Sequence, residues 1–90
     1  MSNKKYFNLD ILTPNGIAFS ERVISLKAPG TTGLFGVLLN HIPSFFLLKK
    51  GLLEVQAIGG NKKFAISGGV ADVSEHYVQI ITTSAQLVED

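Results

Sequence analysis

Apolar and polar residues alternate along most of this chain, in short runs that turn residues separate. A period of two residues is typical of a β-strand that buries one face. The residues expected to face the core from such strands are Phe7, Leu9 and Ile11; Ile24, Leu26 and Ala28; Leu53, Val55 and Ala57; Phe64 and Ile66; and Val78, Ile80 and Thr82. Helical periodicity is absent, and only residues 84–90 have a composition that allows a helix to start. The pattern therefore predicts an all-β chain.

Turn residues recur at the spacing of about 8–12 residues that is expected of a β-sandwich or barrel. Residues 13–16, Thr-Pro-Asn-Gly, predict a tight turn, because proline presets φ and glycine accepts positive φ. Residues 29–33 predict a loop, and residues 58–62 predict a hairpin turn around two adjacent glycines. A chain of 90 residues leaves no room for two cores, so we expect one domain over residues 1–90.

One segment breaks the alternation, because residues 45–48 are apolar at four consecutive positions. A strand that is apolar on both faces is usually covered on both faces. Residues 34–48 hold nine leucine, phenylalanine and valine side chains: Leu34, Phe35, Val37, Leu38, Leu39, Phe45, Phe46, Leu47 and Leu48. The thin core of a small sandwich does not readily absorb them all, although complete burial remains the alternative. Because large exposed apolar patches mark interaction sites, the sequence favours a binding or assembly module over an enzyme.

Composition narrows the class of protein further. A hydrophobic fraction of 46% argues against disorder. The absence of cysteine excludes a disulfide framework and a thiolate metal site, and it fits a reducing compartment. The first ten residues lack the apolar region of a signal peptide, and no apolar run reaches the length of a membrane span. We therefore expect a soluble, cytosolic chain.

The net charge of +1 is unevenly distributed, because residues 1–63 hold all eight basic residues and residues 64–90 hold four acidic residues and no base. Most of the basic residues occur as adjacent lysine pairs at positions 4–5, 49–50 and 62–63. Neighbours on a strand point to opposite faces, so such pairs do not form a patch. A nucleic-acid site needs a basic stripe with exposed aromatic residues. We therefore expect no nucleic-acid partner.

Candidate catalytic and metal-ligating residues are few. His41 lies in an expected loop and would need an acidic or nucleophilic partner to act as a base. Asp72, Glu75 and His76 have the spacing of a short loop without the second ligand cluster of a metal site. We interpret His76 as a solvated turn residue and Asp72 as a strand-end or turn residue, and we expect no catalytic residue, metal or cofactor.

Two glycine-rich stretches have some features of chemical motifs but lack the context that such motifs need. Residues 30–36 lack the helix and the Gly-Lys-Ser/Thr sequence that a phosphate-binding loop requires. Ser67-Gly68-Gly69 lacks the strand-to-helix context of a serine nucleophile. We expect the two glycines to let the chain turn or to let another backbone come close.

The order and spacing of these motifs resemble a known family. Five stretches carry the likeness: Gly33–Val37, Asn40–Pro43, Gly51, Ser67–Gly69 and Val78–Ala85. They are similar to the Gly-x-Leu-Gly-Ile, Gly-His-Ala-Pro, Gly, Ser-Gly-Gly and terminal strand motifs of the epsilon subunit of F-type ATP synthases, in its N-terminal domain. The opening residues 9–19 also resemble this domain, so the likeness covers about residues 6–88.

The resemblance implies a flattened two-layer sandwich of about ten short, mostly antiparallel strands. It also implies a non-catalytic subunit of the rotor, or central stalk, which contacts the gamma subunit and the membrane ring of c subunits. Such a subunit couples ion-driven rotation to ATP synthesis and is attached peripherally to the cytoplasmic face of the membrane through the complex. A rotor part needs a stiff body and broad fixed contacts, which agrees with the apolar surplus.

The resemblance further implies which residues meet each partner. The expected c-ring contacts are Thr31, Thr32, Gly33, Leu34, Asn40 and His41, and the expected gamma contacts are Thr13, Phe45, Phe46 and Leu48. The alternative to a rotor subunit is a free-standing sandwich module that binds a peptide or carbohydrate. Only Tyr6 and Tyr77 are available as exposed aromatic residues for such a site.

The chain departs from the family pattern at three places. Asn40 replaces a family glycine, and asparagine adopts the left-handed conformation more readily than most residues. Leu34 replaces a residue that is often charged, which removes a possible ion pair with the ring. The sequence also ends at Asp90, where many family members continue into a helical hairpin that inhibits hydrolysis and in some members binds ATP. We therefore expect no ATP binding and no self-inhibition from this chain.

Overall fold

The computed structural model describes residues 6–38 and 43–88, and these residues form nine strands and no helix. The strands are β1 (Phe7–Thr13), β2 (Gly16–Gly30), β3 (Gly33–Leu38), β4 (Ser44–Leu48), β5 (Gly51–Ala57), β6 (Gly60–Ile66), β7 (Gly69–Val73), β8 (Tyr77–Ile81) and β9 (Ala85–Val88). The all-β prediction is confirmed. The described part of the chain has no helix of the length and apolarity that a membrane span requires.

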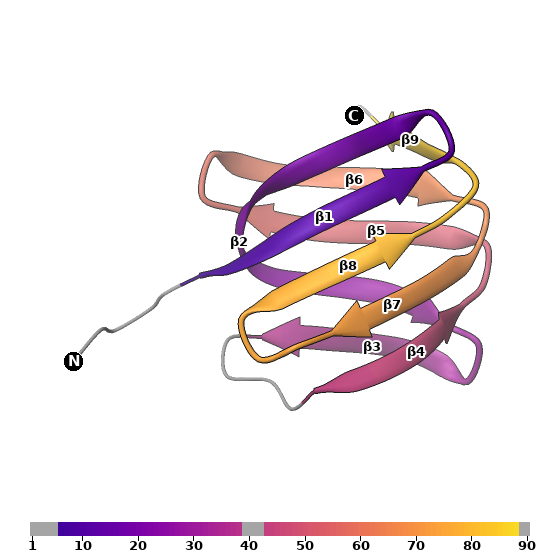
Figure 1. Cartoon of the computed structure of the whole chain (residues 1–90), viewed down its shortest axis with the longest axis horizontal. Coiled ribbons are helices and arrows are strands. Elements are labelled where there is room, and N and C mark those ends of the chain that lie inside the picture. The colour runs from indigo at the N-terminus through magenta and orange to yellow at the C-terminus, as the bar shows by residue number, and fades with distance from the viewer. Residues whose placement is uncertain (1–5, 39–42, 89–90) are drawn as a thin grey trace.

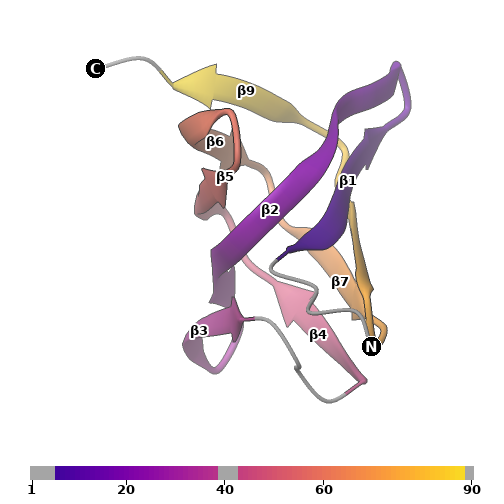
Figure 2. The same cartoon turned by 90° about the vertical axis from the view of Figure 1, so that its left-hand side faces the viewer.

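The strands form one mixed sheet that folds into the two layers of a sandwich (Figures 1 and 2). The order is β1-β8-β7-β4-β2-β5-β6-β9, and β3 pairs with β2 outside this path. We call β1, β8, β7 and β4 the first layer, and β3, β5, β6 and β9 the second layer. All pairings are antiparallel except that of β1 with β8, which is parallel.

The longest strand, β2, belongs to both layers. Its first half pairs with β1 from Gly16 to Val23, and its second half pairs with β5 and β3 from Val23 to Gly30. A single pairing of Gly30 with Leu48 connects β2 to β4 at the opposite side of the sandwich. One continuous strand therefore joins the two layers.

The core lies between the layers and consists of one cluster of buried apolar side chains. Its largest fully buried members are Phe7, Leu9, Ile11, Leu26, Leu53, Ile80, Val23 and Val78. The faces predicted for β1, β5, β6 and β8 are confirmed, and Thr82 is also buried just after β8. The rings of Phe19 and Phe64 meet edge to face, with centroids 5.3 Å apart.

The prediction for the middle of β2 is wrong at Ile24. This side chain is 41% exposed, whereas Val23 is fully buried. The pairing of β2 with β5 shifts register between Val23 and Ser25, and an extra residue at such a bulge reverses the faces on one side of it. Ile24 therefore faces outward although Leu26 and Ala28 face the core.

The chain after β8 also differs from the prediction, because residues 85–88 form β9 instead of starting a helix. β9 pairs antiparallel with β6, which satisfies its backbone groups in a ladder. The expected turns at residues 13–16 and 58–62 are confirmed as the β1–β2 and β5–β6 hairpins. In the second turn, the positive φ belongs to Gly60, at +131°, and not to both glycines.

Candidate functional site

The four apolar residues of β4 divide between the two faces of the first layer. Phe45 and Leu47 point outward, with 64% and 58% of their surfaces exposed. Leu48 is buried in the core, so this expected gamma contact does not present its side chain to a partner. Phe46 is half-buried and stacks on Phe35 of β3, with ring centroids 4.0 Å apart. The first layer thus has apolar side chains on its outer face as well as its inner face.

Leu47 belongs to an apolar row that crosses the whole first layer. The cross-strand register places Leu47 opposite Val70, Val70 opposite Ile81, and Ile81 opposite Leu12. We call these four residues, from β4, β7, β8 and β1, the outer row. Leu47 and Ile81 are exposed, and Val70 and Leu12 are half-buried. Cross-strand partners lie on the same face of a sheet, so the row is a continuous apolar strip.

A polar row runs beside the outer row on the same face. It consists of Asp72, Gln79, Asp10 and Ser20, which follow Phe45 in register across β7, β8, β1 and β2. Asp10 accepts hydrogen bonds at both carboxylate oxygens, from Ser20 Oγ at 2.6 Å and from the Tyr77 hydroxyl at 2.7 Å. The hydrogen bond to Asp10 raises the pKa of Tyr77, and burial and the Asp10 charge act in the same direction.

Thr13, another expected gamma contact, lies at the end of β1 beside the outer row. Its hydroxyl donates to the Gly16 carbonyl at 3.1 Å and accepts from the Asn15 N–H at 3.2 Å, so it organises the β1–β2 turn. Thr13 also lines a hollow of about 560 Å³, together with Leu12 and Ile81 of the outer row. The hollow therefore continues the apolar strip to the end of the sandwich.

The Ser67-Gly68-Gly69 motif forms the opposite wall of this hollow. A Cβ atom on Gly69 would lie 2.0 Å from the Ile81 carbonyl oxygen, and the φ angle of Gly69 is +133°. The prediction that these glycines allow a close backbone approach is confirmed. Ser67 Oγ lies 2.6 Å from Thr83 Oγ1, which joins the β6–β7 link to the chain after β8.

Four of the residues expected at the c ring, Thr31, Thr32, Gly33 and Leu34, lie at the β2–β3 turn and the start of β3, and not in the outer row. Thr31 and Thr32 form the turn between β2 and β3, and Gly33 and Leu34 begin β3. Leu34 is 75% exposed, beside two exposed threonines. The Thr31 N–H donates to the Leu47 carbonyl at 3.0 Å, which fixes the turn against β4.

Asn40 and His41, the other expected c-ring contacts, lie outside the described residues. The chain enters their segment from β3 and leaves it toward β4. β3 therefore connects the β2–β3 turn to the segment that holds these two residues in the sequence.

Among the residues that the structure describes, the polar candidates for chemistry, Asp72, Glu75 and His76, do not assemble a metal site. His76 lies in the β7–β8 turn, exposed, with its Nε2 atom 3.4 Å from Glu75 Oε1. Asp72 lies within β7 and points outward. Within residues 6–38 and 43–88, no group of three or more histidine, cysteine, aspartate or glutamate residues could hold a metal ion.

Sequence reasoning missed three members of the outer row as contact candidates: Leu12, Val70 and Ile81. Each stands next to a core residue, namely Ile11, Ala71 and Ile80. The sequence does show that each of these apolar residues is at a position that alternation assigns to the outer face of its strand. Only the register between strands shows that they form the outer row.

Comparison with known proteins places this arrangement in a family. The family described as "ATP synthase, Delta/Epsilon chain, beta-sandwich domain" matches residues 6–88. The chain belongs to this family.

Two relatives within the delta/epsilon family are ATP synthase epsilon chains of Nitratidesulfovibrio vulgaris and Rhodopseudomonas palustris. The first is 40% identical over 97% of this chain and 65% of its own length, and the second is 37% identical over 93% of this chain and 62% of its own length. The chain thus spans slightly less than two thirds of the length of these relatives.

Solved structures agree with the family's fold. A chain in the cryo-EM structure of the Euglena gracilis mitochondrial ATP synthase, described as "OSCP/F1/c-ring", superposes with a TM-score of 0.87. It is 28% identical, over 97% of this chain and 56% of its own. A chain from the central stalk and c ring of the Tetrahymena thermophila enzyme has a TM-score of 0.75 at 16% identity, which supports the fold alone.

Proposed function

We propose that this chain is a non-catalytic rotor subunit of an F-type ATP synthase. In this role it docks the gamma subunit onto the c ring and couples ion-driven rotation to ATP synthesis. The observation that carries the proposal is the outer row, because a family member with an apolar strip across one layer has a surface suited to a permanent partner. The chain would be attached peripherally at the cytoplasmic face of the membrane, through the complex and without a cofactor.

The outer face of the first layer has the composition of a protein–protein interface. Stable interfaces combine an apolar centre with a polar rim. Here the outer row supplies the apolar centre, and the Asp10–Tyr77 hydrogen bond lies in the polar strip beside it. We therefore assign this face to the gamma subunit, with Phe45 and Leu47 as its most exposed large apolar side chains.

The edge formed by β3 and its two flanking segments is the proposed c-ring contact. The Thr31–Leu34 corner contributes the β2–β3 turn and the start of β3 to this contact, and Asn40 and His41 are proposed as contacts on the sequence resemblance alone. Exposed hydroxyls at Thr31 and Thr32 suit the polar loops of such a ring. Leu34 adds an apolar contact in place of a charge.

Charge substitutions in the outer row test the gamma contact. We expect the Leu47→Asp and Ile81→Asp variants to stay folded and to bind a purified gamma subunit about 30-fold more weakly or worse, since removing a central interface residue costs about 2 kcal/mol or more. Isothermal titration calorimetry measures the affinity, and circular dichroism confirms the fold.

The matched control is Leu52→Asp on the second layer, because Leu52 and Ile81 are both 45% exposed. We expect this variant to bind gamma as the unchanged chain does. Equal binding by all three variants would refute the assignment of this face. Failure of the unchanged chain to co-purify with gamma and c rings would refute the rotor function itself.

A further inference from the structure

Within the part of the chain that the structure describes, the last strand in the sheet order, β9, has a free edge. Among the described residues, β9 pairs only with β6. The Ser67 N–H donates to the Ser84 carbonyl just before the ladder begins. Hydrogen-bonded and non-hydrogen-bonded pairs alternate along an antiparallel ladder. The register of β6 with β9 therefore directs the N–H and C=O groups of Ala85 and Leu87 away from β6, toward the free edge.

This edge has one of the features that usually protect an edge strand, a short length of four residues, and lacks the others. Natural edges are also blocked by charged residues, proline or bulges, and Ala85–Val88 contains no charged residue and no proline, with no register shift in its pairing with β6. Leu87 and Val88 are 50% and 37% exposed. The strand thus presents backbone donors and acceptors beside apolar side chains.

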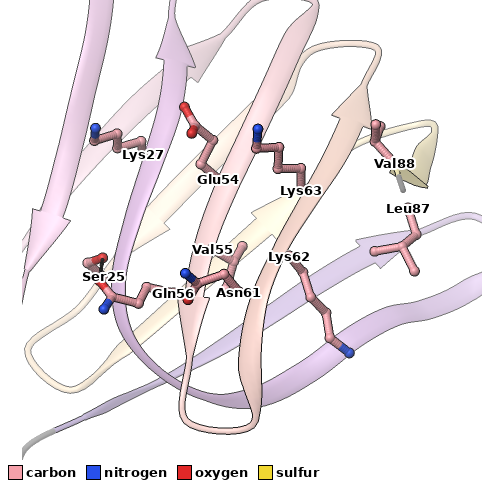
Figure 3. A pocket seen from close by; sticks show the side chains of 10 residues that line it. All are labelled: Ser25, Lys27, Glu54, Val55, Gln56, Asn61, Lys62, Lys63, Leu87 and Val88. Carbon is pink, nitrogen blue, oxygen red and sulfur yellow. Dashed lines mark hydrogen bonds between the residues drawn. The ribbon is translucent and has the colours of Figure 1, made fainter. Parts of the chain in front are cut away.

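On the outer side of β9 lies a basic groove of about 550 Å³ (Figure 3). The register aligns Lys27, Glu54, Lys63 and Val88 in one row across β2, β5, β6 and β9. A second row of Ser25, Gln56 and Asn61 provides neutral polar groups. The charged side chains of the groove are Lys27, Lys63 and Glu54, so its net charge is positive, whereas the Lys62 ammonium lies beside Glu21 and over the Phe19 ring on the other face.

On the inner side of β9 lies a second hollow of about 390 Å³, lined by both apolar and polar residues. Leu87 lies opposite Phe64 in the register and lines this hollow together with Ile17 and Phe19 of β2. Lys62 lies 3.7 Å from Glu21 at the rim. The free edge therefore lies between a basic outer groove and an inner hollow that combines apolar side chains with Ser20, Glu21 and Lys62.

We propose that the free edge of β9 binds an extended segment of a partner protein in which apolar and acidic side chains alternate. Such a segment adds a strand to the sheet, since successive residues of a strand point to opposite sides. Its apolar side chains enter the hollow between Ile17 and Leu87, and its carboxylates lie on the groove side, where Lys63 of β6 is the lysine of the row nearest to β9. The site belongs to the second layer and does not depend on the proposed gamma contact.

The test uses the full chain and a fluorescent peptide of four valine–glutamate repeats. We expect binding in a fluorescence anisotropy titration, and NMR shift changes at Ala85–Val88 and Lys63. A valine–lysine peptide should not bind. Lys63→Glu should weaken binding of the acidic peptide at least about tenfold through like-charge repulsion. The matched control Lys50→Glu, which makes the same charge change in the β4–β5 connection, should change it less than about twofold.

A backbone variant tests the added strand itself. Leu87→Pro removes an N–H that points to the free edge and should abolish binding, whereas Leu87→Ala keeps the N–H and should retain it. If Leu87→Pro does not fold, the added strand is tested in the unchanged chain, where peptide binding should slow hydrogen exchange at the Ala85 and Leu87 amides. Equal binding of both peptides, no binding at about 1 mM peptide, shifts elsewhere on the surface, or self-association through β9 in place of peptide binding would overturn the proposal.

Discussion

Gly69 occupies a position where the backbone of β8 excludes any side chain. The Cβ position of Gly69 lies 2.0 Å from the Ile81 carbonyl oxygen, and its φ of +133° disfavours other residues. We expect Gly69→Ala to lower the free energy of unfolding by about 3 kcal/mol or more, because it combines a backbone clash with an unfavourable φ. Urea denaturation measures the change.

Gly59 is the matched control for this substitution. Its φ is not positive, and its Cβ position has only Glu21 Oε1 nearby, at 3.7 Å. Gly59→Ala should change the free energy of unfolding by less than about 0.5 kcal/mol. A similar small change at Gly69 would show that β8 can move away from this position.

The Tyr77–Asp10 hydrogen bond predicts a pH dependence at the alkaline end. The pKa of Tyr77 is raised above 10.0 in the folded chain, first because its hydroxyl donates to Asp10. The folded state therefore retains this proton when the unfolded state begins to lose it. The stabilisation is complete below pH 10 and is lost as the pH rises through the folded pKa of Tyr77.

An ultraviolet titration of tyrosinate formation tests this prediction in a Tyr6→Phe background, where Tyr77 is the only tyrosine. Asp10→Asn removes the negative charge and should lower the pKa of Tyr77 toward its ordinary value. The alkaline loss of stability should shrink in the same variant. An unchanged titration would mean that Asp10 does not hold the Tyr77 proton.

Within β2, two adjacent apolar residues should respond in opposite ways to the same substitution. Val23→Asp places a charge in the core and should cost more than about 3 kcal/mol of stability. Ile24→Asp should cost less than about 1 kcal/mol, because Ile24 is on the outer side of the bulge. Thermal unfolding of both variants distinguishes the observed bulge from a regular strand, which would reverse their order.

Local alternation was sufficient to predict the buried faces of β1, β5, β6 and β8, because these strands have one regular face toward the core. It failed at Ile24, where the bulge depends on how β2 pairs with β5. It also failed for residues 85–88, whose strand forms by pairing with β6 and not by local preference. Pairing between distant segments is not encoded in the period of a single run.

The candidate site was predictable only in part for the same reason. Four consecutive apolar residues in β4 indicated a second covered face, and two of them, Phe45 and Leu47, do point outward. The strip from Leu47 to Leu12 requires the register of three strand pairs, including the parallel pair β1–β8. The basic groove likewise arises from pairing, since it aligns Lys27 of β2 with Lys63 of β6 through Glu54.

At the scale of the whole molecule, backbone protection should differ between the centre and the edge of the sheet. β8 lies between β1 and β7, and its residues Val78 and Ile80 are fully buried. We expect the amides of Val78 and Ile80 to exchange only when the whole domain unfolds. The amides of Ala85 and Leu87 should exchange from the folded state, without global unfolding. Hydrogen exchange monitored by NMR tests this, and slow exchange at Leu87 in the isolated chain would contradict a free edge.

The shared strand β2 also has a mechanical consequence. A force applied to the first layer along the direction of β2 is transmitted to the second layer through the covalent backbone of this strand. Its transmission does not depend on side-chain packing between the layers. The hydrogen-bond ladders to β1 and β5 run along this strand. A load parallel to β2 would therefore act on all of these hydrogen bonds at the same time and would not break them one by one. Slippage of one layer over the other would require β2 itself to tear away from its neighbours.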